Sequence, residues 1–433
     1  MKIVEPPFID PYAGNILFKD FKVDLSPEKV LEKITVIPSV PRHIELIPHH
    51  TRLHLLMDVR DFYAPPQTVG EVATTISLMI GQGYKYRNPS DSRTWMRISG
   101  HEALYKRKTP PASAALLTGE SGNGKTLAVD QITSNIYPQV CWHESYPGII
   151  GPHMQVVHLS ANVPASGRSV DLARALGIQW DLATRGDRFA SFRKNNNRRS
   201  GPQMLDEFLL VAATHSLGFL HLDEIQNLFH IPTLEERKKK KTPGQPDPML
   251  RVVDDDSLKW ILTATNSWGI PILASGTPDG AGALTKRLST IGRLSTMGYY
   301  YLEHFESSDR KSFYRKIFLA RLLDLQYVKD RIADSDELAQ LIIDRTAGVP
   351  RHIIALWVAA HRVAFDRAAA SGSRVDNLLL QDFDIAANTY LKLLQPCVKA
   401  LLSNTPDARS RYEDLVPRDD DFWALFWNNV GKV

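Results

Sequence analysis

The residues best suited to chemistry form a glycine-rich run, GESGNGKT, in the first third of the chain. Its members are Gly119, Glu120, Ser121, Gly122, Asn123, Gly124, Lys125 and Thr126. In a phosphate-binding loop (P-loop) of this pattern, the glycines let the backbone N–H groups turn inward around the phosphates. The lysine then reaches the β- and γ-phosphates and the hydroxyl binds Mg²⁺. The run therefore predicts a site for ATP and Mg²⁺, although eight residues alone also fit a plain glycine-rich turn between a strand and a helix.

An acid pair about one hundred residues downstream supplies the second half of such a site. Asp223 and Glu224 follow the apolar run FLHL, which starts at Phe219. Asp223 can hold a metal-bound water, and Glu224 can polarise the water that attacks the γ-phosphate. We therefore expect Asp223 at the metal and Glu224 as the catalytic base of an ATPase. The acids could instead cap a following helix, and His221 inside the run receives no role.

Short apolar runs of strand length must position these two motifs. They are Ala114 to Leu117, Met154 to Leu159, Phe219 to Leu222, Ile270 to Ser275 and Tyr299 to Leu302. Helical patterns fill the intervals, and strands that alternate with helices predict a parallel sheet covered on both faces. The first run leads into the glycine-rich loop and a helical stretch follows it, as a P-loop requires. We therefore predict an α/β fold with a five-stranded parallel sheet flanked by helices.

The chain on either side of this core follows other patterns. Beyond Ser307 only helical patterns occur, over about 309–325, 335–345, 350–369 and 379–394. The first 66 residues are proline-rich and broken, and residues 69–80 are spaced as a helix that Gly81 and Gly83 would end. A helical lid after a five-stranded sheet is the layout of AAA+ P-loop ATPases. The predicted division is an N-terminal arm or small irregular domain at 1–66, an AAA+ nucleotide-binding domain at 67–306, a helical lid at 307–395 and a C-terminal segment at 396–433.

Four further residues fit positions that complete an AAA+ site. Thr277, in the turn after the fourth strand, would place a hydroxyl beside the γ-phosphate (sensor 1), with Ser275 as the second choice. Arg351, at the start of a lid helix, would reach the nucleotide from the lid (sensor 2), because the helix dipole there favours an anion. Arg287 and Arg293 lie between the fourth and fifth strands, where an AAA+ subunit carries the arginine that completes its neighbour's site. Each of these could also be a plain turn residue or a solvated helix charge.

The composition excludes several classes of protein. Of the 433 residues, 43% are hydrophobic and 23% are charged, as in ordinary globular proteins. The sequence contains no uncharged apolar run of about 18 residues, which a membrane span would need. The first residues lack a secretory signal pattern. The two distant cysteines, Cys141 and Cys397, predict neither a metal site nor a disulfide framework. We therefore expect a cytoplasmic protein without a membrane partner, and the net charge of +4 is too small to argue for nucleic acid by itself.

Two basic segments interrupt the predicted core. Residues 185–199 (RGDRFASFRKNNNRR) lie between the second and third strands, where AAA+ proteins place elements that face a central channel. Lys194, Arg198 and Arg199 have the cationic chemistry for contacts to DNA phosphates, which carry no base information. They therefore predict DNA binding without sequence preference, or else a solvated charged face. The lysine run at 238–241 fits a solvated surface loop better.

Most of the chain resembles TnsC, the AAA+ regulator of heteromeric-transposase transposons that include the CRISPR-associated ones, and more distantly TniB. Besides GESGNGKT and LDEIQNL, the resemblance rests on four segments outside these motifs. They are SLMIGQGYKYRNP at 77–89, YPQV at 137–140, GTP at 276–278 and RYEDLVP at 411–417. The P-loop and the acid pair are common to many ATPases, so YRNP and RYEDLVP make the resemblance specific.

The resemblance implies a bacterial, ATP-dependent matchmaker. Such proteins assemble on double-stranded target DNA as rings or helical filaments when ATP is bound. They receive a target-selection protein of the TnsD or TniQ type, recruit transposase subunits, and are disassembled by ATP hydrolysis. The sequence stops at Val433 without the long charged C-terminal extension of some members, so we expect either a different transposase contact or a trimmed chain.

A loader or signalling ATPase that acts on a protein partner is the main alternative function. Its basic loops would only face solvent. A metabolic P-loop kinase fits less well, because a glutamate directly after the metal-binding aspartate suits activation of water. A lid arginine also suits an ATPase that works between subunits.

Overall fold

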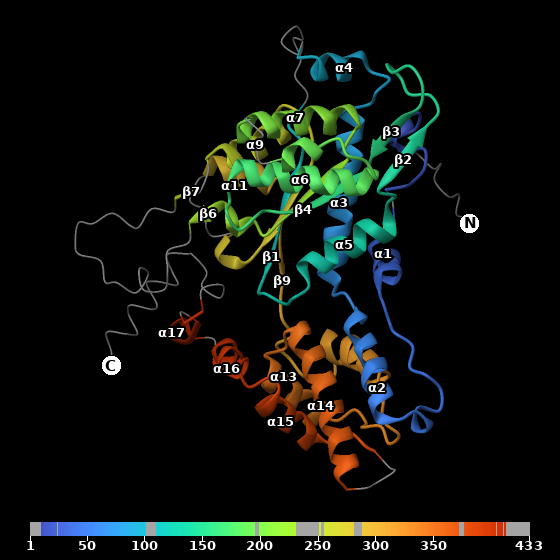
Figure 1. The fold of residues 1–433 in the computed structure, drawn as a ribbon, viewed down its shortest axis with the longest axis vertical. Coiled ribbons are helices and arrows are strands. Elements are labelled where there is room, and N and C mark those ends of the chain that lie inside the picture. Colours follow the sequence, from blue (N-terminus) through green and yellow to red (C-terminus); the bar gives the residue numbers. More distant parts are fainter. Residues whose placement is uncertain are drawn as a thin grey trace, which may run out of the picture.

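The computed structural model describes residues 10–23, 25–100, 110–194, 199–230, 251–252, 255–280, 288–371, 376–403, 405–409 and 411–412. It has an upper body built around a sheet and a lower body built from helices (Figure 1). The upper body carries the P-loop and the acid pair. None of the helices in this described part of the chain has the length and apolar character of a membrane span.

Five parallel strands form the central sheet, in the spatial order β4-β5-β8-β1-β9. Their bounds are Ala114–Gly119 (β1), His158–Asn162 (β4), Phe219–Asp223 (β5), Ile272–Gly276 (β8) and Tyr299–Leu302 (β9). The predicted five-stranded parallel sheet is confirmed. Because β8 lies between β1 and β5, the carboxyl ends of these three strands meet at one edge of the sheet. The P-loop, Ser275 and the acid pair are thereby brought together.

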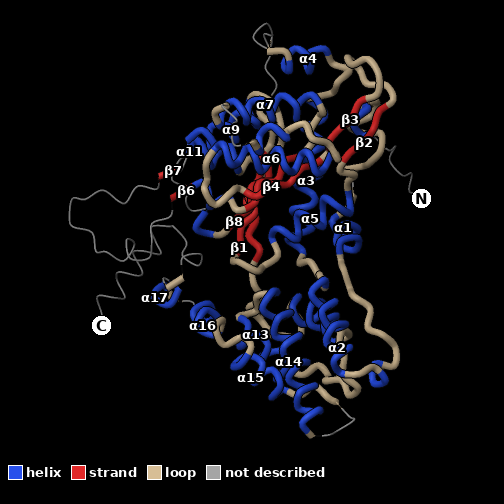
Figure 2. The backbone as a smooth tube through the Cα atoms, viewed as in Figure 1, coloured by secondary structure: helices blue, strands red, loops and turns tan. Residues whose placement is uncertain are grey.

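Two layers of helices cover the two faces of the sheet (Figure 2). The first layer contains α6 (Ser169–Thr184), α7 (Gly201–Thr214), α9 (Asp255–Asn266) and α11 (Leu288–Leu294). The second contains α1 (Pro27–Ile34), α3 (Gln67–Tyr86) and α5 (Lys125–Ile136). Ala114 and Leu116 of β1 join the first hydrophobic core, whereas Ala115 and Leu117 join the second. Burial on both faces explains why this strand is a continuous apolar run in the sequence.

One predicted strand is wrong in its extent. Residues 154–159 belong to two strands, because β3 (His153–Val156) pairs antiparallel with β2 (Val140–His143) and β4 begins at His158. The chain passes from this hairpin to the central sheet at Val157. Val156 and Val157 are both fully buried, so the apolar run continues across the transfer and hides it.

The helix before the P-loop is longer than its sequence pattern predicts. α3 continues through Gly81 and Gly83 to Tyr86 instead of ending at the glycines. A Cβ at Gly81 would lie 2.1 Å from the hydroxyl oxygen of Tyr12, and one at Gly83 would lie 2.8 Å from Cγ of Pro271. The two glycines therefore allow neighbouring segments to approach α3 closely, and they do not end the helix.

The lower body contains the predicted lid helices. They are a π-helical segment (Tyr314–Leu319) that continues as α12 (Ala320–Leu323), then α13 (Asp336–Thr346), α14 (Pro350–Ala370) and α15 (Leu380–Thr389). The helix predicted at 309–325 becomes regular only near Tyr314. Two short helices follow, α16 (Gln395–Ser403) and α17 (Pro406–Arg409).

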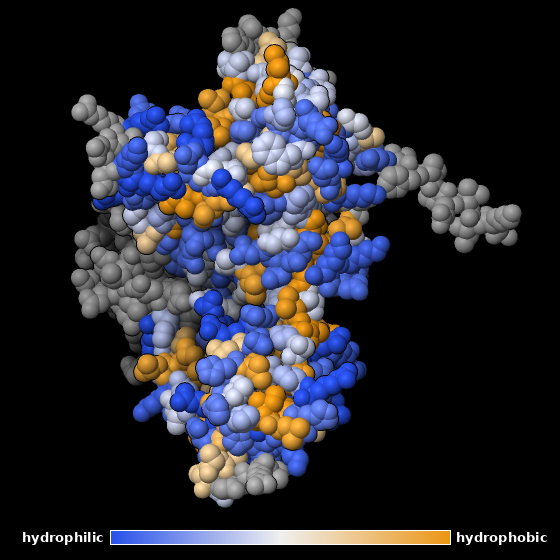
Figure 3. Space-filling view, turned by 45° about the vertical axis from the view of Figure 1, so that its right-hand side comes forward, coloured by the Kyte–Doolittle hydropathy of each residue, from blue (hydrophilic) through white to orange (hydrophobic). Residues whose placement is uncertain are grey.

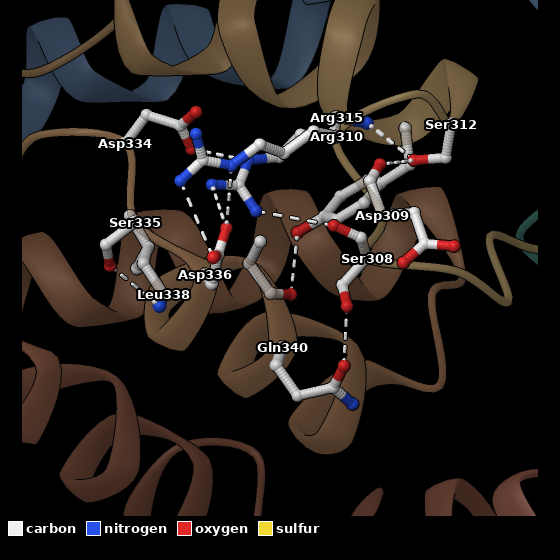
Figure 4. Close-up of polar contacts among 12 residues, drawn as sticks. Ser308, Asp309, Arg310, Ser312, Arg315, Asp334, Ser335, Asp336, Leu338 and Gln340 are labelled. Carbon is white, nitrogen blue, oxygen red and sulfur yellow. Dashed lines mark hydrogen bonds and ion pairs between the residues drawn. The ribbon is translucent and has the colours of Figure 1, made fainter.

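Two arginines tie the start of the lid to the N-terminus of α13 (Figure 4). Nε of the buried Arg315 lies 2.6 Å from Oδ1 of Asp334, and its Nη2 lies 3.2 Å from Oδ1 of Asp336. Nε of the exposed Arg310 also lies 3.1 Å from Oδ1 of Asp336. The hydroxyl of Ser335 caps α13, and acids at a helix N-terminus are favoured by the helix dipole.

The N-terminal residues contribute to two cores. Leu17 and Val30 pack with α3 and α5 against the sheet, whereas Leu56 and Val59 pack with the lid helices. α2 (His49–Leu55) lies beside α14 in the lower body (Figure 1). A buried ion pair between Arg52 of α2 and Asp376, in the loop before α15, fastens this segment to the lid.

Candidate nucleotide site

The predicted phosphate-binding loop joins β1 to α5 and opens into a cavity. Gly122 and Gly124 have φ angles of +95° and +87°, a left-handed conformation that glycine adopts without strain. A Cβ at Gly122 would also lie 3.2 Å from the Cβ of Arg351 in the lid. Residues 121–126 all line the cavity. Their backbone therefore has the shape of a phosphate cradle at a helix N-terminus.

The Lys125 ammonium is held within this loop. Its Nζ donates hydrogen bonds to the carbonyl oxygens of Gly119, at 2.8 Å, and Glu120, at 3.1 Å. Burial lowers the pKa of Lys125, and the nearby carboxylates of Asp223 and Glu224 oppose that shift. An ammonium with carbonyl partners at the mouth of a phosphate cradle can exchange them for stronger, charged phosphate oxygens.

The side chain of Glu120 is buried beside β9 and does not line the cavity. Its carboxylate accepts hydrogen bonds from the Tyr301 hydroxyl at 2.5 Å and from Nδ2 of Asn123 at 2.9 Å. Nδ1 of His304 lies 3.7 Å away, and Nη2 of Arg409 in α17 lies 4.0 Å away. Burial by itself would raise the pKa of Glu120, but the contacts with His304 and Tyr301 outweigh it and lower the pKa to about 2. The Glu120 carboxylate thus supports the loop from the side away from the cavity. A nucleotide in the cavity can contact only the backbone of Glu120.

Glu120→Gln is expected to weaken the fold most at neutral pH. The folded-state pKa of about 2 lies below the ordinary value of 4.5. The ionised carboxylate therefore stabilises the fold fully above about pH 4.5, and this contribution is lost as the pH falls towards 2. Urea unfolding at several pH values should show the free-energy difference between wild type and Glu120→Gln shrinking across that window. A difference that stays constant from pH 7 to pH 3 would contradict this role.

Thr126 and Asp223, the two predicted metal ligands, lie in direct contact. The Thr126 hydroxyl donates to Oδ2 of Asp223, and the backbone N–H of Glu224 donates to Oδ1 at 2.9 Å. Burial would raise the pKa of Asp223, but the surrounding polar groups, with His221 foremost, lower it. Asp223 is therefore a carboxylate at neutral pH. A hydroxyl and a carboxylate oxygen beside a phosphate cradle match the oxygen ligands that Mg²⁺ prefers, so this donor set fits the ion.

Glu224 lines the same cavity and has an unusual backbone conformation. Its φ and ψ angles are 58° and 41°, a left-handed region where non-glycine residues are uncommon and often functional. Nε2 of Gln226 donates to the Glu224 carboxylate, and Oε1 of Gln226 accepts from the backbone N–H of Thr277 at 3.3 Å. Gln226, which sequence analysis missed, therefore joins the predicted base to the turn after β8. In the sequence, the one indication of this role is that Gln226 is a polar residue in the segment IQNL, directly after the acid pair.

The two hydroxyls at the end of β8 have different surroundings. Thr277 lines the cavity, and its hydroxyl donates to Asp279. Ser275 is fully buried, and its hydroxyl donates to Oδ1 of Asp223 at 2.5 Å. Ser275 also contacts His221, whose pKa burial lowers to about 4. A nucleotide can therefore meet Thr277 directly and Ser275 only through Asp223, and the sensor role of Thr277 stays a prediction.

The predicted lid arginine lies at the cavity. Arg351 is in the first turn of α14, its backbone N–H donates to the carbonyl of Gly122 at 3.3 Å, and its side chain lines the cavity. Arg293 is exposed on α11 and is not among the described residues that line the cavity. Arg287 lies outside the described residues. An arginine that completes a neighbour's site need not reach its own, so the intersubunit role of both residues stays a prediction.

The cavity extends well beyond the P-loop, to a volume of about 1220 Å³. Its far wall is largely apolar and comes from both bodies. The wall includes Phe62, Tyr63, Ala64 and Pro66 of the N-terminal segment and Ile354 and Val358 of α14. Figure 3 shows apolar surface at the waist between the two bodies. An apolar slot beside a phosphate cradle suits the base of a nucleotide. Sequence analysis missed this wall, for which the run FYAPP before α3 is the signal.

Two of the basic residues predicted to bind DNA, Lys194 and Arg199, are described, and neither lines the cavity. Lys194 is exposed after the short helix Ala190–Arg193. Nη1 of Arg199 pairs with Glu207 of α7, whose other carboxylate oxygen pairs with Arg188 at 3.2 Å. Arg198 and the lysine run at 238–241 lie outside the described residues. A DNA phosphate at Arg199 would therefore compete with Glu207 for the guanidinium or share it.

The YRNP segment supports the sheet from α3. Arg87 is buried, and its Nη1 donates to the carbonyl of Leu217 at 2.6 Å while its Nε donates to that of Gly83 at 3.1 Å. Burial lowers the pKa of Arg87 to about 10. This arginine thus fastens α3 to the loop that leads into β5. Of the RYEDLVP segment, only Arg411 and Tyr412 are described.

The chain is similar to one protein family and to several solved structures. Residues 109–284 match the family described as "AAA domain", and no curated protein sequence matches the chain significantly. Similar solved structures include the ORC1 protein of Aeropyrum pernix in complex with DNA (14% identity over 73% of this chain and 69% of that one, TM-score 0.36). The ORC2 protein of Aeropyrum pernix in its ADP form is also similar (14% identity over 80% of this chain and 85% of that one, TM-score 0.39). So is Cdc6p of Pyrobaculum aerophilum (14% identity over 78% of this chain and 84% of that one, TM-score 0.36). Likenesses this low carry no functional argument. The family match and the sheet with its helical lid agree in fold: the chain has the AAA+ P-loop fold, and residues 109–284 are similar to the AAA domain.

Proposed function

We propose that this protein binds and hydrolyses ATP with Mg²⁺. One observation carries the proposal: Lys125, Thr126 and Glu224 line one cavity, and Asp223 contacts Thr126 directly behind it. A P-loop, a metal-binding acid and a second acid suited to activate water are the parts that ATP hydrolysis needs.

Each group has a distinct task in this reaction. Lys125 and the backbone N–H groups of the loop hold the phosphates, and Thr126 and Asp223 would hold Mg²⁺, which neutralises charge on the phosphate oxygens. Glu224 orients the attacking water and accepts its proton. Arg351 meets the phosphates from the lid, so the position of the lid responds to the nucleotide.

We further propose that the ATP-bound protein forms homo-oligomers on double-stranded DNA and regulates transposition in the bacterial cytoplasm. In this role it links a target-selection protein of the TnsD or TniQ type to the transposase subunits. The TnsC-like segments YRNP and RYEDLVP support this proposal. The exposed positions of Lys194 and Arg293 are compatible with contacts to DNA and to a neighbouring subunit.

A loader or signalling ATPase that acts on a protein is the second candidate. The pairing of Glu207 with both Arg188 and Arg199 favours it, because the carboxylate already neutralises part of the charge that DNA would need.

Assembly on DNA separates the two candidates. The protein is mixed with a nonhydrolysable ATP analogue or with ADP, with and without duplex DNA of arbitrary sequence, and examined by sedimentation and negative-stain imaging. The transposition regulator predicts large assemblies only with the analogue and DNA, and none from Lys125→Ala. Nucleotide binding without DNA-dependent assembly would support the second candidate, and failure of the wild type to bind nucleotide would reject both.

The double variant Lys194→Ala/Arg199→Ala is expected to weaken DNA binding by a similar factor on every sequence. Phosphate contacts carry no base information, and each lost contact flattens the slope of log affinity against log salt by about 0.9. Binding isotherms on two unrelated duplexes at three salt concentrations measure both effects. Arg310→Ala/Arg345→Ala, which removes two lid arginines and the same charge, is the matched control. An unchanged slope in the first variant would place the DNA contact elsewhere.

A further inference from the structure

His221 lies at the centre of a hydrogen-bond chain that crosses three strands and ends on Asp223. The residue is fully buried in β5. Its Nδ1 lies 2.8 Å from Oγ of Ser160 on β4, and its Nε2 lies 2.7 Å from Oγ of Ser275 on β8. Oγ of Ser275 lies 2.5 Å from Oδ1 of Asp223. A buried polar ring in a strand core is costly unless its bonds are made, and here both ring nitrogens have partners.

The carboxylate at the end of this chain determines the direction of every bond in it. A carboxylate only accepts, so the Ser275 hydroxyl must donate its one hydrogen to Asp223. The Ser275 oxygen must then accept a hydrogen from Nε2 of His221. A neutral imidazole carries one ring hydrogen, so Nδ1 is an acceptor and takes the hydrogen of the Ser160 hydroxyl. The bonds therefore run in one direction, from Ser160 through His221 and Ser275 to Asp223.

We propose that His221 is a positioning residue for the metal-binding carboxylate of Asp223. Through Ser275 it secures Oδ1, which also accepts the backbone N–H of Glu224. Two protein donors on Oδ1 turn Oδ2 towards Thr126 and a bound Mg²⁺. Outer hydrogen bonds of this kind orient the groups that hold a metal. This inference rests on the proposed ATP hydrolysis and adds a residue to its metal site.

His221→Leu is expected to raise the Mg²⁺ concentration needed for half-maximal hydrolysis by about 10- to 100-fold, the usual effect of losing an outer partner of a metal site. Leucine remains buried and removes both bonds. Calorimetry with a nonhydrolysable ATP analogue should show the same shift in the Mg²⁺ dependence of nucleotide affinity. Affinity measured with a chelator present should not change, because the P-loop is intact.

Two further variants separate positioning from packing. His221→Gln can accept from Ser160 and donate to Ser275, so it should restore most of the Mg²⁺ affinity. His158→Leu removes another buried histidine, two residues before Ser160 on β4, that lies outside this chain of bonds. It should leave the Mg²⁺ dependence unchanged, whatever its effect on thermal stability.

A double-mutant cycle tests the route through Ser275. If His221 acts on Asp223 through Ser275, Ser275→Ala alone should shift the Mg²⁺ dependence, and adding His221→Leu should shift it no further. Additive shifts would overturn the inference, and so would a His221→Leu protein with wild-type Mg²⁺ dependence. If His221→Leu does not fold, Ser160→Ala carries the test, because it removes the first donor and should shift the Mg²⁺ dependence in the same direction. A wild type without ATP hydrolysis rejects the proposed function itself, whereas an active wild type with unshifted variants rejects only this inference.

Discussion

Glu224→Gln is expected to slow ATP hydrolysis by about 10²- to 10⁴-fold, the range typical of losing one general base. Glutamine has the same shape but cannot accept a proton from water. The loop residues, Thr126 and Asp223 do not change, so ATP and Mg²⁺ should bind with wild-type affinity. Phosphate release at saturating ATP measures the first effect, and equilibrium binding of ATP measures the second. If the protein assembles on DNA, the assemblies of this variant should persist after ATP is added.

Another glutamate of the cavity lining provides a matched control. Glu303 lines the same cavity, and Glu303→Gln makes the same chemical change without removing the predicted base. It should hydrolyse ATP at close to the wild-type rate. If Glu224→Gln hydrolysed ATP at the wild-type rate, or if both variants lost the same fraction of the hydrolysis rate, Glu224 would not be the base.

Asp376→Ala is expected to reduce the free energy of unfolding by about 3–5 kcal/mol, the usual cost of breaking a buried ion pair from one side. Asp376 and Arg52 are 1% and 2% exposed. Arg52 also donates to the carbonyls of Ile47 and Tyr327, and Asp376 accepts from the backbone N–H of Lys329 at 3.2 Å. Without Asp376, the guanidinium stays buried without a counter-charge. Because the pair joins α2 to the lid, this loss should also loosen the wall of the nucleotide cavity.

A partly exposed pair in the same body gives the contrast. Nε of Arg345 lies 2.8 Å from Oδ1 of Asp384, with side-chain exposures of 35% and 43%. Asp384→Ala should change the free energy of unfolding by only about 0–1 kcal/mol, as for other solvent-accessible pairs. Urea unfolding of the two variants measures the difference. A loss below about 1 kcal/mol for Asp376→Ala would mean that the buried pair does not hold α2 to the lid.

The sequence by itself determined the sheet, the P-loop and the acid pair. These features are local, because the loop from Gly119 to Thr126 is contiguous and the three central strands, β1, β5 and β8, are runs buried on both faces. Even the meeting of the P-loop with Asp223 follows, since the carboxyl ends of parallel strands share one edge. The same local reasoning failed where a pattern continued across a change of partner, as at Val157. It also took Gly81 and Gly83 as the end of a helix, although their backbone is helical and their missing side chains make room for Tyr12 and Pro271.

Only the tertiary structure decided which groups meet across the strands and between the two bodies. Ser160, His221 and Ser275 are more than fifty residues apart in sequence, and they form one chain of bonds only because β4, β5 and β8 are adjacent in a particular register. Tertiary contacts also decided that Ser275 and not Thr277 bonds to Asp223. They turned the Glu120 carboxylate away from the cavity, and they paired Arg199 with Glu207. A residue type states which bonds a side chain can make, but its direction and its partner are determined by the packing of segments that are distant in the chain.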